Sequence, residues 1–360
     1  MSEKSKTMLV AGCTGVNGYA VSRYFEQLSE KANGWQLKTL ARGDDQYGFN
    51  SASHISVDLL DSDAVDAAAE KFSDITHIFY GVLAPSDDPK EEADLNARMF
   101  ETLLKTVDRV SPNFERVIFL QGGKVYGAHL GVYKSPAKED DSRHFPPNLY
   151  FRHEDFAKAF SAAKDWGWTA LRPDIVIGHS VGSAMNMGNL IGVYASLCKE
   201  LGLDLHFPGS AKAYEILVNT CDADLVAMAA DWAIAQKADG AFNITNGDVF
   251  RWKHVWPQIA DHFGLKVAEP QPFDMQTRLS AQSEVWSGMV EKYGLEKHDV
   301  LDLGQGSFGD FIFNVEADAI FDVNKARRAG FQVMNRDSGQ SFIRHFEAMQ
   351  AAKLIPDFSE

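Results

Sequence analysis

Three glycines stand at intervals of three residues, directly after an apolar run near the start of the chain. The run Met8–Ala11 predicts a short buried strand and Val16–Ser29 predicts a helix, so Gly12 and Gly15 occupy the intervening turn and Gly18 lies at the start of the helix. Such glycines permit a tight turn, close approach of backbone N–H groups to a pyrophosphate, and close packing of helix on strand. An ordinary glycine-rich turn is the alternative. The order of strand, turn and helix favours a dinucleotide-binding turn.

A basic residue follows the second expected strand. A cation at this point favours the 2′-phosphate of NADP, whereas a carboxylate favours NAD, and Arg42 stands there. Asp44 and Asp45 follow directly and complicate the choice, and a solvated surface arginine is the alternative to a phosphate ligand. Asp58, after the third strand, can accept a hydrogen bond from an adenine amino group. Alternatively it can cap the next helix, although Asp61 could cap that helix equally well. We favour NADP over NAD.

A lysine and several tyrosines follow the expected fifth strand and introduce the next helix. Lys124 and Tyr126 leave the carboxyl end of Arg116–Gln121, near where a nicotinamide would lie. Dehydrogenases of this architecture commonly place a Tyr and a Lys on one helical turn, with three residues between them. No tyrosine here has that partner: the residues four positions after Tyr126, Tyr133 and Tyr150 are Leu130, Ala137 and Glu154. The common ketone-reducing pair is therefore absent.

Several longer motifs together carry a resemblance to a known family. They are Gly12–Gly18, Ala41-Arg42, Leu120-Gln121 with Lys124 and Tyr126-Gly127, Asn148–Phe151 with Glu154-Asp155, Arg172-Pro173, Asn246–His254 and Asp322–Lys325. With these motifs the chain resembles the progesterone 5β-reductase/iridoid synthase-like (PRISE) family of short-chain dehydrogenases. The resemblance spans nearly the whole chain. It implies an NADPH-dependent reductase of the C=C bond in enones and enals.

The resemblance also implies roles for two side chains. The family's catalytic Lys falls on Lys124 and its catalytic Tyr falls on Tyr150. A phenol aimed at the substrate carbonyl oxygen would stabilise the enolate that forms when hydride reaches the β-carbon. The lysine would hold the nicotinamide ribose, and solvent would supply the proton on the α-carbon. The alternatives are a core aromatic residue for Tyr150 and a surface lysine for Lys124, while Tyr126 is a weaker candidate that packs beneath the loop.

The expected binding residues extend along the strand ends. Cofactor contacts are expected from Gly12, Thr14, Gly15, Val16, Asn17, Gly18, Arg42, Asp58, Leu59, Gly81, Val82, Gln121, Lys124, Tyr150, Pro173 and Val176. Substrate contacts are expected from Tyr150, from Phe308, which matches an aromatic residue of the family's pocket, and from Met185 and Met187, with Trp286 as a further candidate. The alternative for apolar residues at such spacing is ordinary core packing.

Three positions depart from the family pattern. Gly43 stands where the family often has a second Arg, which weakens the NADP preference. Asp174 replaces the usual Gly after Arg172-Pro173, near the expected nicotinamide carboxamide. The loop that carries Lys124 is one residue shorter than in plant members. These departures affect the substrate class more than the fold.

Alternating strand and helix patterns must position these residues. Strands are expected at Met8–Ala11, Gln36–Ala41, His54–Asp58, His77–Val82, Arg116–Gln121 and Thr169–Ile177, and helices at Val16–Ser29, Ser62–Phe72, Glu91–Arg109 and Asp155–Trp166. This alternation predicts an α/β fold with a doubly wound parallel sheet of the Rossmann type. We expect a dinucleotide-binding domain at 1–178, with segments returning near 214–250. A smaller, mainly helical substrate lobe is expected at 179–360.

The later half of the chain is expected to be mainly helical. We expect helices at Met185–Leu201, Asp222–Gln236 (amphipathic), His254–Phe263 and through Gln258–Lys297, with a strand at Ala241–Ile244. The run Phe250–His254 mixes cations and aromatic residues, a pattern that can also indicate nucleic-acid binding. We assign the run a structural role because the chain is acidic and the run opens a helix.

Composition limits the partners. The 360 residues carry a net charge of −15 without a basic run, which argues against nucleic acid and anionic membrane surfaces. No stretch is apolar enough to cross a bilayer, Met1–Thr7 is polar, and three cysteines without metal-like spacing predict reduced, mostly buried thiols, so we expect a cytoplasmic protein. No metal is expected. The expected partner is a small enone, enal or carbonyl substrate, and a homodimer is one candidate assembly. A carbonyl reductase or a non-catalytic NADP sensor are the competing functions.

Overall fold

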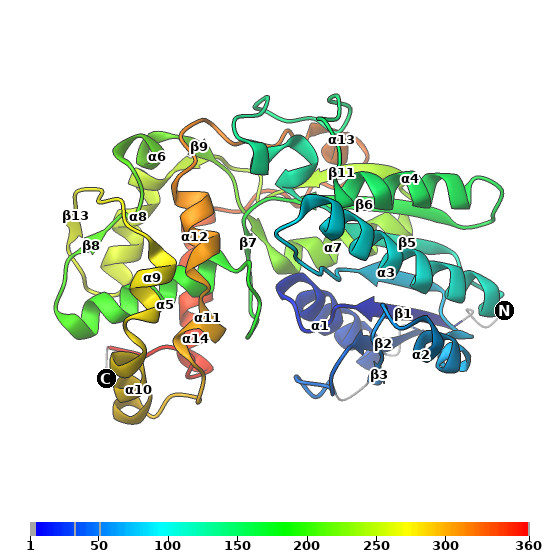
Figure 1. The fold of residues 1–360 in the computed structure, drawn as a ribbon, viewed down its shortest axis with the longest axis horizontal. Helices are drawn as coiled ribbons and strands as arrows, with labels where there is room; N and C mark the ends of the chain where they lie inside the picture. The colour runs from blue at the N-terminus through cyan, green and yellow to red at the C-terminus, as the bar shows by residue number, and fades with distance from the viewer. Residues whose placement is uncertain (1–4, 32–33, 50–51, 359–360) are drawn as a thin grey trace.

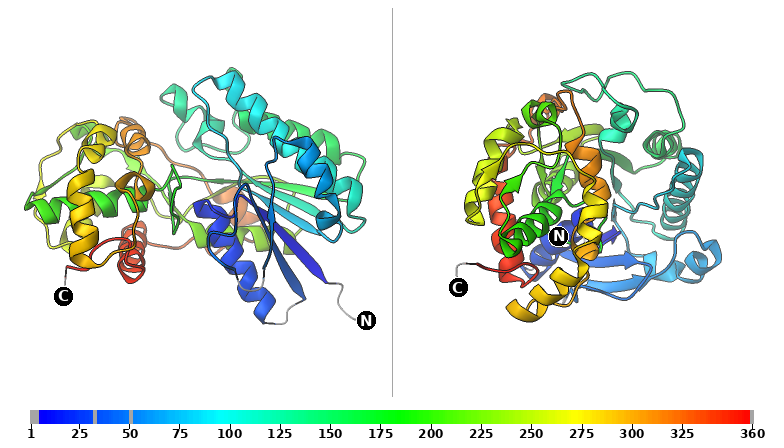
Figure 2. Two further views of the ribbon diagram at one scale, coloured as in Figure 1. Left: turned by 60° about the horizontal axis from the view of Figure 1, so that its bottom comes forward. Right: turned by 60° about the vertical axis from the view of Figure 1, so that its left-hand side comes forward.

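The computed structural model describes residues 5–31, 34–49 and 52–358 and shows two lobes side by side (Figures 1 and 2). The first lobe contains a seven-stranded sheet in which all neighbouring strands are parallel. Across the sheet the strands are β11 (Gly240–Ile244), β6 (Gly167–Pro173), β5 (Arg116–Leu120), β4 (His77–Tyr80), β1 (Lys6–Ala11), β2 (Trp35–Ala41) and β3 (Ala52–Ser56). The doubly wound α/β fold expected from the alternation is confirmed.

Helices cover both faces of this sheet. One layer contains α1 (Val16–Glu30), α7 (Ala223–Ala235) and α13 (Asn324–Arg328); the other contains α2 (Ser62–Ala67), the 3₁₀ turn η1 (Ala69–Phe72), α3 (Pro89–Val110) and α4 (Leu149–Ser161). Successive β1 side chains enter opposite cores, Met8 and Val10 toward α1 and α7, Leu9 and Ala11 toward α3. Because both faces are covered, β1 is a continuous apolar run rather than an alternating one.

The strand order reverses between β1 and β4. β2 and β3 lie to one side of this point, and β5, β6 and β11 lie to the other. Connections from β1 and β4 therefore leave in opposite directions, which opens a crevice at the carboxyl ends of these two strands. Both Gly12 and Gly81 directly follow these strands.

The second lobe is mainly helical and has its own core. Its helices are α5 (Met187–Leu201), α6 (Ala211–Glu215), α8 (Trp252–His262), α9 (Met275–Ser280), α10 (Ser283–Tyr293), α11 (Val300–Leu303), α12 (Gly306–Phe313) and α14 (Ser338–Ala351). Short strand pairs complete the second half of the chain: β7 (Val176–Ile177) with β10 (Cys221–Asp222), β8 (Leu205–His206) with β13 (Val267–Ala268), and β9 (Leu217–Val218) with β12 (Phe250–Arg251). Trp252 and Trp256 are fully buried, so the run at the start of α8 is structural.

Several expected boundaries were wrong. The expected strand Thr169–Ile177 is two strands, because Pro173 lacks an N–H and Ile175 turns the chain with φ +26°. The expected helix Asp155–Trp166 begins instead at Leu149, where the Asn148 side chain caps it.

Other helices also differ from the expectation. Helix α7 is buried over most of its surface rather than amphipathic, because the sheet covers one side and α1 packs on another. The helical pattern at 258–297 is interrupted by β13 and a proline-containing turn before α9. The third strand ends at Ser56, and the pattern at 62–72 divides into α2 and η1.

None of the described helices combines the length and apolarity that a membrane crossing requires.

Candidate functional site

The glycine-rich turn is built so closely that two of its positions exclude a side chain. Gly12 has φ +83°, and a Cβ built there would lie 2.9 Å from the carbonyl carbon and oxygen of Gly81. A Cβ built at Gly18 would lie 2.0 Å from the Gly12 oxygen, so α1 rests directly on the turn. At Gly15 a Cβ would meet only ordinary contact, 3.6 Å from the same oxygen. Gly15 therefore leaves space on the side where a ligand would approach.

The start of α1 presents polar groups that the protein does not use. Gly15 is the N-cap of α1 and contributes no side-chain cap, and the first turn carries no acidic residue. The buried Oδ1 of Asn17 has no hydrogen-bond partner among the described residues. Open helix N–H groups form a cradle for an anion, whereas the Asn17 oxygen is an acceptor and would need a donor group of the ligand. A dinucleotide pyrophosphate fits this turn.

The cation that follows β2 has no side-chain partner among the described residues. Arg42 is exposed, and its guanidinium contacts none of the described residues through a hydrogen bond or ion pair. Asp45, in contrast, accepts from the backbone N–H groups of Tyr47, Gly48 and Phe49 at 3.0–3.2 Å. This carboxylate holds its own loop, while Asp44 is exposed beside it. Of the two acids that complicated the cofactor choice, one is therefore occupied.

Two aspartates between β3 and α2 are candidates for the N-cap of α2. Asp61 accepts from the N–H groups of Asp63 and Ala64 and is the cap. Asp58 accepts only from the N–H of Leu60, at 2.9 Å, which leaves one of its oxygens unused by the described residues. Asp58 remains a candidate for an adenine amino group. The adjacent Leu59 is buried in the sheet core, and Gly81 and Val82 are partly exposed after β4.

Lys124 lies on the short 3₁₀ turn η2 (Gly123–Tyr126), which follows β5. Its Nζ contacts both carboxylate oxygens of Glu92, at 2.8 and 2.9 Å, and Glu92 belongs to the first turn of α3. The lysine side chain is 36% exposed and the glutamate 12%. The ammonium is thus held at the carboxyl edge of the sheet and is not a freely moving surface lysine.

Tyr150 stands in the first turn of α4. Its N–H donates to the Asn148 side chain, which also donates to the backbone oxygen of Lys124 at 2.9 Å. The same asparagine therefore fixes the start of the tyrosine helix and the lysine turn. A Cβ built at Gly122 would lie 3.6 Å from the Tyr150 hydroxyl and 3.8 Å from the Pro173 oxygen. The hydroxyl therefore lies near the carboxyl ends of β5 and β6, as a nicotinamide partner requires.

The Tyr150 hydroxyl makes no hydrogen bond to any residue that the structure describes. Burial, reinforced by the negative charge of Glu92, raises the pKa of this phenol well above its usual value. A neutral phenol donates a hydrogen bond across the physiological pH range. Tyr150 can therefore serve as a donor to a ligand oxygen.

A buried polar network supports the tyrosine helix. Arg172 donates to the Gln121 side chain at 2.6 Å and to Glu154 at 2.9 Å. Gln121 in turn donates to the backbone oxygen of Tyr150 at 3.0 Å. The Gln121 side chain therefore supports the start of α4, and its contact with the cofactor stays a prediction. Tyr126 donates to Asn243 and accepts from Arg172, so it packs behind the site.

Asp174, the departure from the family pattern, lies directly after β6. Its carboxylate accepts from the N–H of Ile175 at 3.1 Å, and burial raises its pKa to about 7. Pro173 is buried at the strand end, and Val176 lies in β7. A carboxyl group with a pKa raised by burial is unusual, because most carboxylates of a protein remain solvated. This one lies near the position expected for the nicotinamide carboxamide.

Comparison with known proteins decides the family. Residues 48–356 match the PRISE-like Rossmann-fold domain. The chain belongs to the PRISE-like family. A short chain dehydrogenase of Penicillium aethiopicum is 29% identical over 98% of this chain and 99% of its own length. An (S)-8-oxocitronellyl enol synthase of Nepeta cataria is 30% identical over 97% and 92%, and a 3-oxo-Delta(4,5)-steroid 5-beta-reductase of Arabidopsis thaliana is 28% identical over 97% and 92%.

Solved structures agree on the fold. A UDP-glucose 4-epimerase has a TM-score of 0.68 at 13% identity, covering 96% of this chain and 98% of its own. The UDP-glucose 4-epimerase of Thermus thermophilus, solved in complex with NAD, has a TM-score of 0.64 at 17% identity, covering 95% and 99%. The family match and the curated relatives show that this PRISE-like protein is an oxidoreductase of the short-chain dehydrogenase/reductase type.

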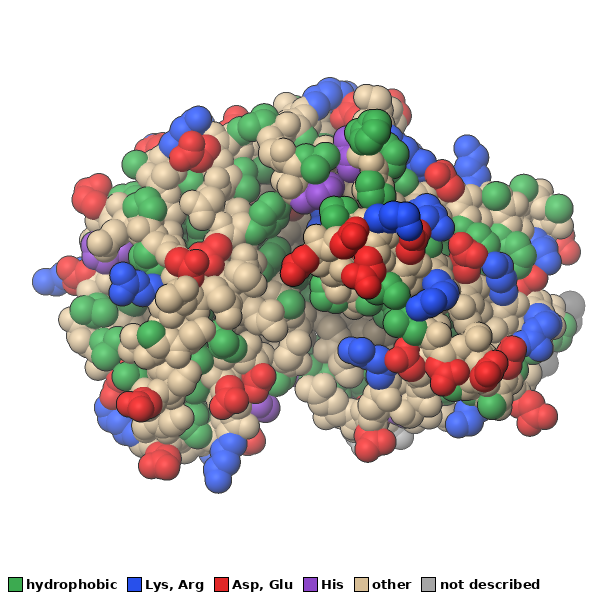
Figure 3. Space-filling model, in the orientation of Figure 1, with side chains coloured by type: hydrophobic (Ala, Val, Ile, Leu, Met, Phe, Trp, Pro, Cys, Tyr) green, Lys and Arg blue, Asp and Glu red, His purple; other side chains and the backbone are tan. Residues whose placement is uncertain are grey.

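The residues expected to contact substrate have different environments in this PRISE-like protein. Phe308, on α12, is partly buried against the core of the second lobe, and Met185 is 43% exposed before α5. Met187 is fully buried in that core, and Trp286 is 2% exposed with its N–H bound to the His298 oxygen. Met187 and Trp286 therefore pack in the core of the second lobe, and their contact with substrate stays a prediction. The surface is hollowed between the two lobes in Figure 3.

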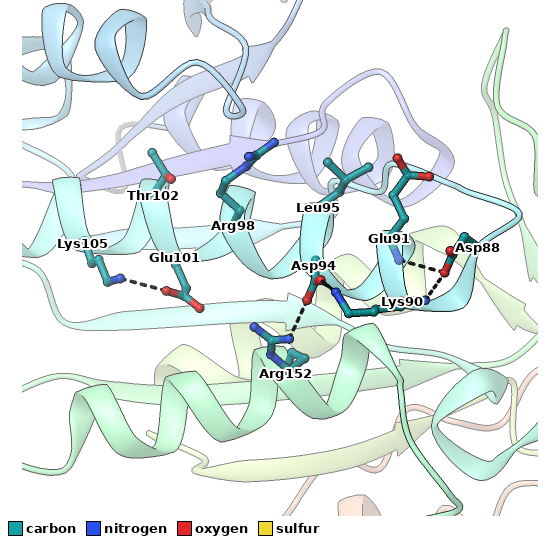
Figure 4. A pocket seen from close by; sticks show the side chains of 10 residues that line it. All are labelled: Asp88, Lys90, Glu91, Asp94, Leu95, Arg98, Glu101, Thr102, Lys105 and Arg152. Atoms are coloured by element: carbon teal, nitrogen blue, oxygen red, sulfur yellow. Dashed lines mark hydrogen bonds and ion pairs between the residues drawn. The ribbon is translucent and has the colours of Figure 1, made fainter.

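A groove of about 570 Å³ on the outer face of α3 is a separate feature (Figure 4). Its walls carry ion pairs, with Lys90 and Arg152 on Asp94 and Lys105 on Glu101. None of the expected site residues lines it. Exposed ion pairs of this kind contribute little to stability.

Sequence reasoning missed two residues of the site. Asn148 appeared only as part of a motif, although its N-cap position before Leu149 could have indicated its capping role. Glu92 carried no signal, because it stands 32 positions before Lys124, on a helix that carries several other acidic residues. The three expected thiols are free and buried, as predicted.

Proposed function

We propose that this protein is an NADPH-dependent reductase of activated C=C bonds, acting on an enone or enal. The observation that carries the proposal is the unpaired Tyr150 hydroxyl at the carboxyl edge of the sheet, with Lys124 held on the adjoining turn. Two relatives of similar length carry names that fit this chemistry, a steroid 5-beta-reductase and an enol synthase. The missing Tyr/Lys pair of common ketone reductases also favours this class.

Each residue of the candidate site would have a separate role in the reaction. NADPH, when bound, would supply hydride to the β-carbon of the substrate. Tyr150 would donate a hydrogen bond to the carbonyl oxygen and stabilise the negative charge that develops on the enolate. Lys124 would bind the nicotinamide ribose and add a fixed positive charge. Solvent would protonate the α-carbon, since the mechanism requires no acid at that atom.

The residues around the turn fit a dinucleotide and favour NADPH over NADH. Gly12 and Gly18 form the close turn, the start of α1 offers open N–H groups to the pyrophosphate, and the buried Asn17 oxygen could accept from a hydroxyl group of the cofactor. Arg42 would grip the 2′-phosphate with its planar guanidinium. The occupied carboxylate of Asp45 supports this preference.

The decisive experiment incubates the purified protein with NADPH and cyclohexenone and identifies the product. A saturated ketone supports the proposal. An allylic alcohol would instead support reduction of the carbonyl, in which Tyr150 would donate its proton to the forming alkoxide. Tight NADPH binding without turnover over a broad panel of enones and carbonyls would support a sensor. Absence of binding to both pyridine nucleotides would refute all three.

A further inference from the structure

The Lys124 ammonium has one acidic partner among the described residues. Both Glu92 carboxylate oxygens contact its Nζ, at 2.8 and 2.9 Å, and the glutamate side chain is only 12% exposed. The pair joins α3 to η2 through two residues that are 32 positions apart in the chain. An ammonium carries three N–H donors, so two bonds to one carboxylate leave a third donor free for a ligand.

The α3 helix does not need Glu92 to begin. Asp88 caps it by accepting from the N–H groups of Lys90 and Glu91, and Pro89 opens the first turn. Glu91, in the same turn, points to solvent and accepts from the Ser86 hydroxyl at 2.6 Å. Glu92 is thus the acid of this turn that faces the candidate site.

We propose that Glu92 is a positioning residue that holds the Lys124 ammonium in place for the cofactor ribose. The inference rests on the role of Lys124 in the proposed function. A free lysine side chain occupies many rotamers, and ordering it on binding opposes affinity. The bidentate contact with Glu92 removes that freedom before the cofactor arrives. Burial, and after it the negative charge of Glu92, raises the pKa of Tyr150, so this carboxylate also favours the neutral phenol.

The first test measures NADPH binding without any substrate. Glu92→Gln keeps the size of the side chain but removes its charge, and we expect the Kd for NADPH to rise about fivefold. Glu91→Gln is the matched control on the same helical turn, and it leaves the Kd unchanged. In a Lys124→Met background, Glu92→Gln has no further effect, because the glutamate acts through the lysine. An unchanged or lower Kd in Glu92→Gln, or an equal effect in the Lys124→Met background, overturns the proposal.

The second test is independent of the cofactor. Limited acetylation with acetic anhydride, followed by mass spectrometry of the Lys124 peptide, reports how often the ion pair opens. We expect Lys124 to react severalfold faster in Glu92→Gln than in the wild type or in Glu91→Gln. Equal rates in all three proteins overturn the positioning role. If the wild type neither binds NADPH nor reduces enones, the proposed function fails, whereas this difference in labelling still decides whether Glu92 holds Lys124.

Discussion

The two ends of the candidate site are built in opposite ways. The end that would bind pyrophosphate is formed by backbone within one segment, Gly12 to Gly18, and glycine is required at the first and last positions because no side chain fits there. The end that would hold the nicotinamide is formed by side chains from separate segments, which include Glu92, Lys124 and Tyr150. Asn148 joins two of these segments. The first end depends on steric room, and the second depends on hydrogen bonds and charge.

This difference predicts how each end responds to substitution. An added methyl group in the backbone-built end displaces main chain and affects binding and folding together. A removed group at the side-chain-built end leaves the backbone in place and affects chemistry first. Four substitutions test this comparison of the two ends, from the largest expected effect to the smallest.

Gly18→Ala tests the backbone-built end. The new Cβ would lie 2.0 Å from the Gly12 oxygen, so α1 or the turn must shift. We expect loss of NADPH binding and a destabilisation of about 1–3 kcal/mol, measured by fluorescence titration and urea unfolding. Gly15→Ala is the control for stability, because a Cβ there has ordinary contact at 3.6 Å. A Gly18→Ala protein that binds and folds like the wild type would contradict the steric argument.

Tyr150→Phe tests the side-chain-built end. The hydroxyl has no partner among the described residues, so its removal leaves the protein contacts intact. We expect kcat for enone reduction to fall by about 10²–10³ while the Kd for NADPH changes less than about twofold. Tyr126→Phe is the comparison, since that hydroxyl bonds to Asn243 and Arg172 and contributes to stability. Full turnover in Tyr150→Phe would show that another group stabilises the enolate.

Arg42→Ala tests the edge of the backbone-built end, where we expect one side chain to determine the preference for NADPH over NADH. Losing a charge-assisted contact with the 2′-phosphate should raise the Kd for NADPH about tenfold and leave that for NADH unchanged. The guanidinium is exposed and free of the described residues, so the melting temperature should not move. Equal weakening of both nucleotides would assign Arg42 a role other than phosphate recognition.

Asn148→Ala tests the junction between the two catalytic segments. Loss of its cap on α4 and of its bond to the Lys124 oxygen should destabilise the protein by about 1 kcal/mol, read from urea unfolding. Asn148→Asp keeps the cap but cannot donate to that oxygen, so it separates helix capping from attachment of the lysine turn. We expect turnover to fall in both variants. Normal turnover in Asn148→Asp would mean that the junction serves folding alone.

Local patterns predicted the first half of the fold well. Apolar runs alternate with helical periodicity there, and each buried strand carries its own signal, as β1 does. The failures lie where tertiary contacts override a local pattern. Helix α4 was placed six residues too late because its start depends on the cap at Asn148, and the long strand near Pro173 was divided by the turn at Ile175. The apolar helix α7 was read as amphipathic, although both of its sides are covered.

The sequence by itself determined the glycine-rich turn, the order of strands and helices, and membership of the family. These features are local, because a glycine with positive φ or an apolar period needs only its neighbours in the chain. Only the tertiary structure decided that Glu92 faces Lys124, that Gln121 supports α4, and that Met187 is core. Such contacts join segments far apart in sequence, and packing of the sheet and its helices sets their geometry.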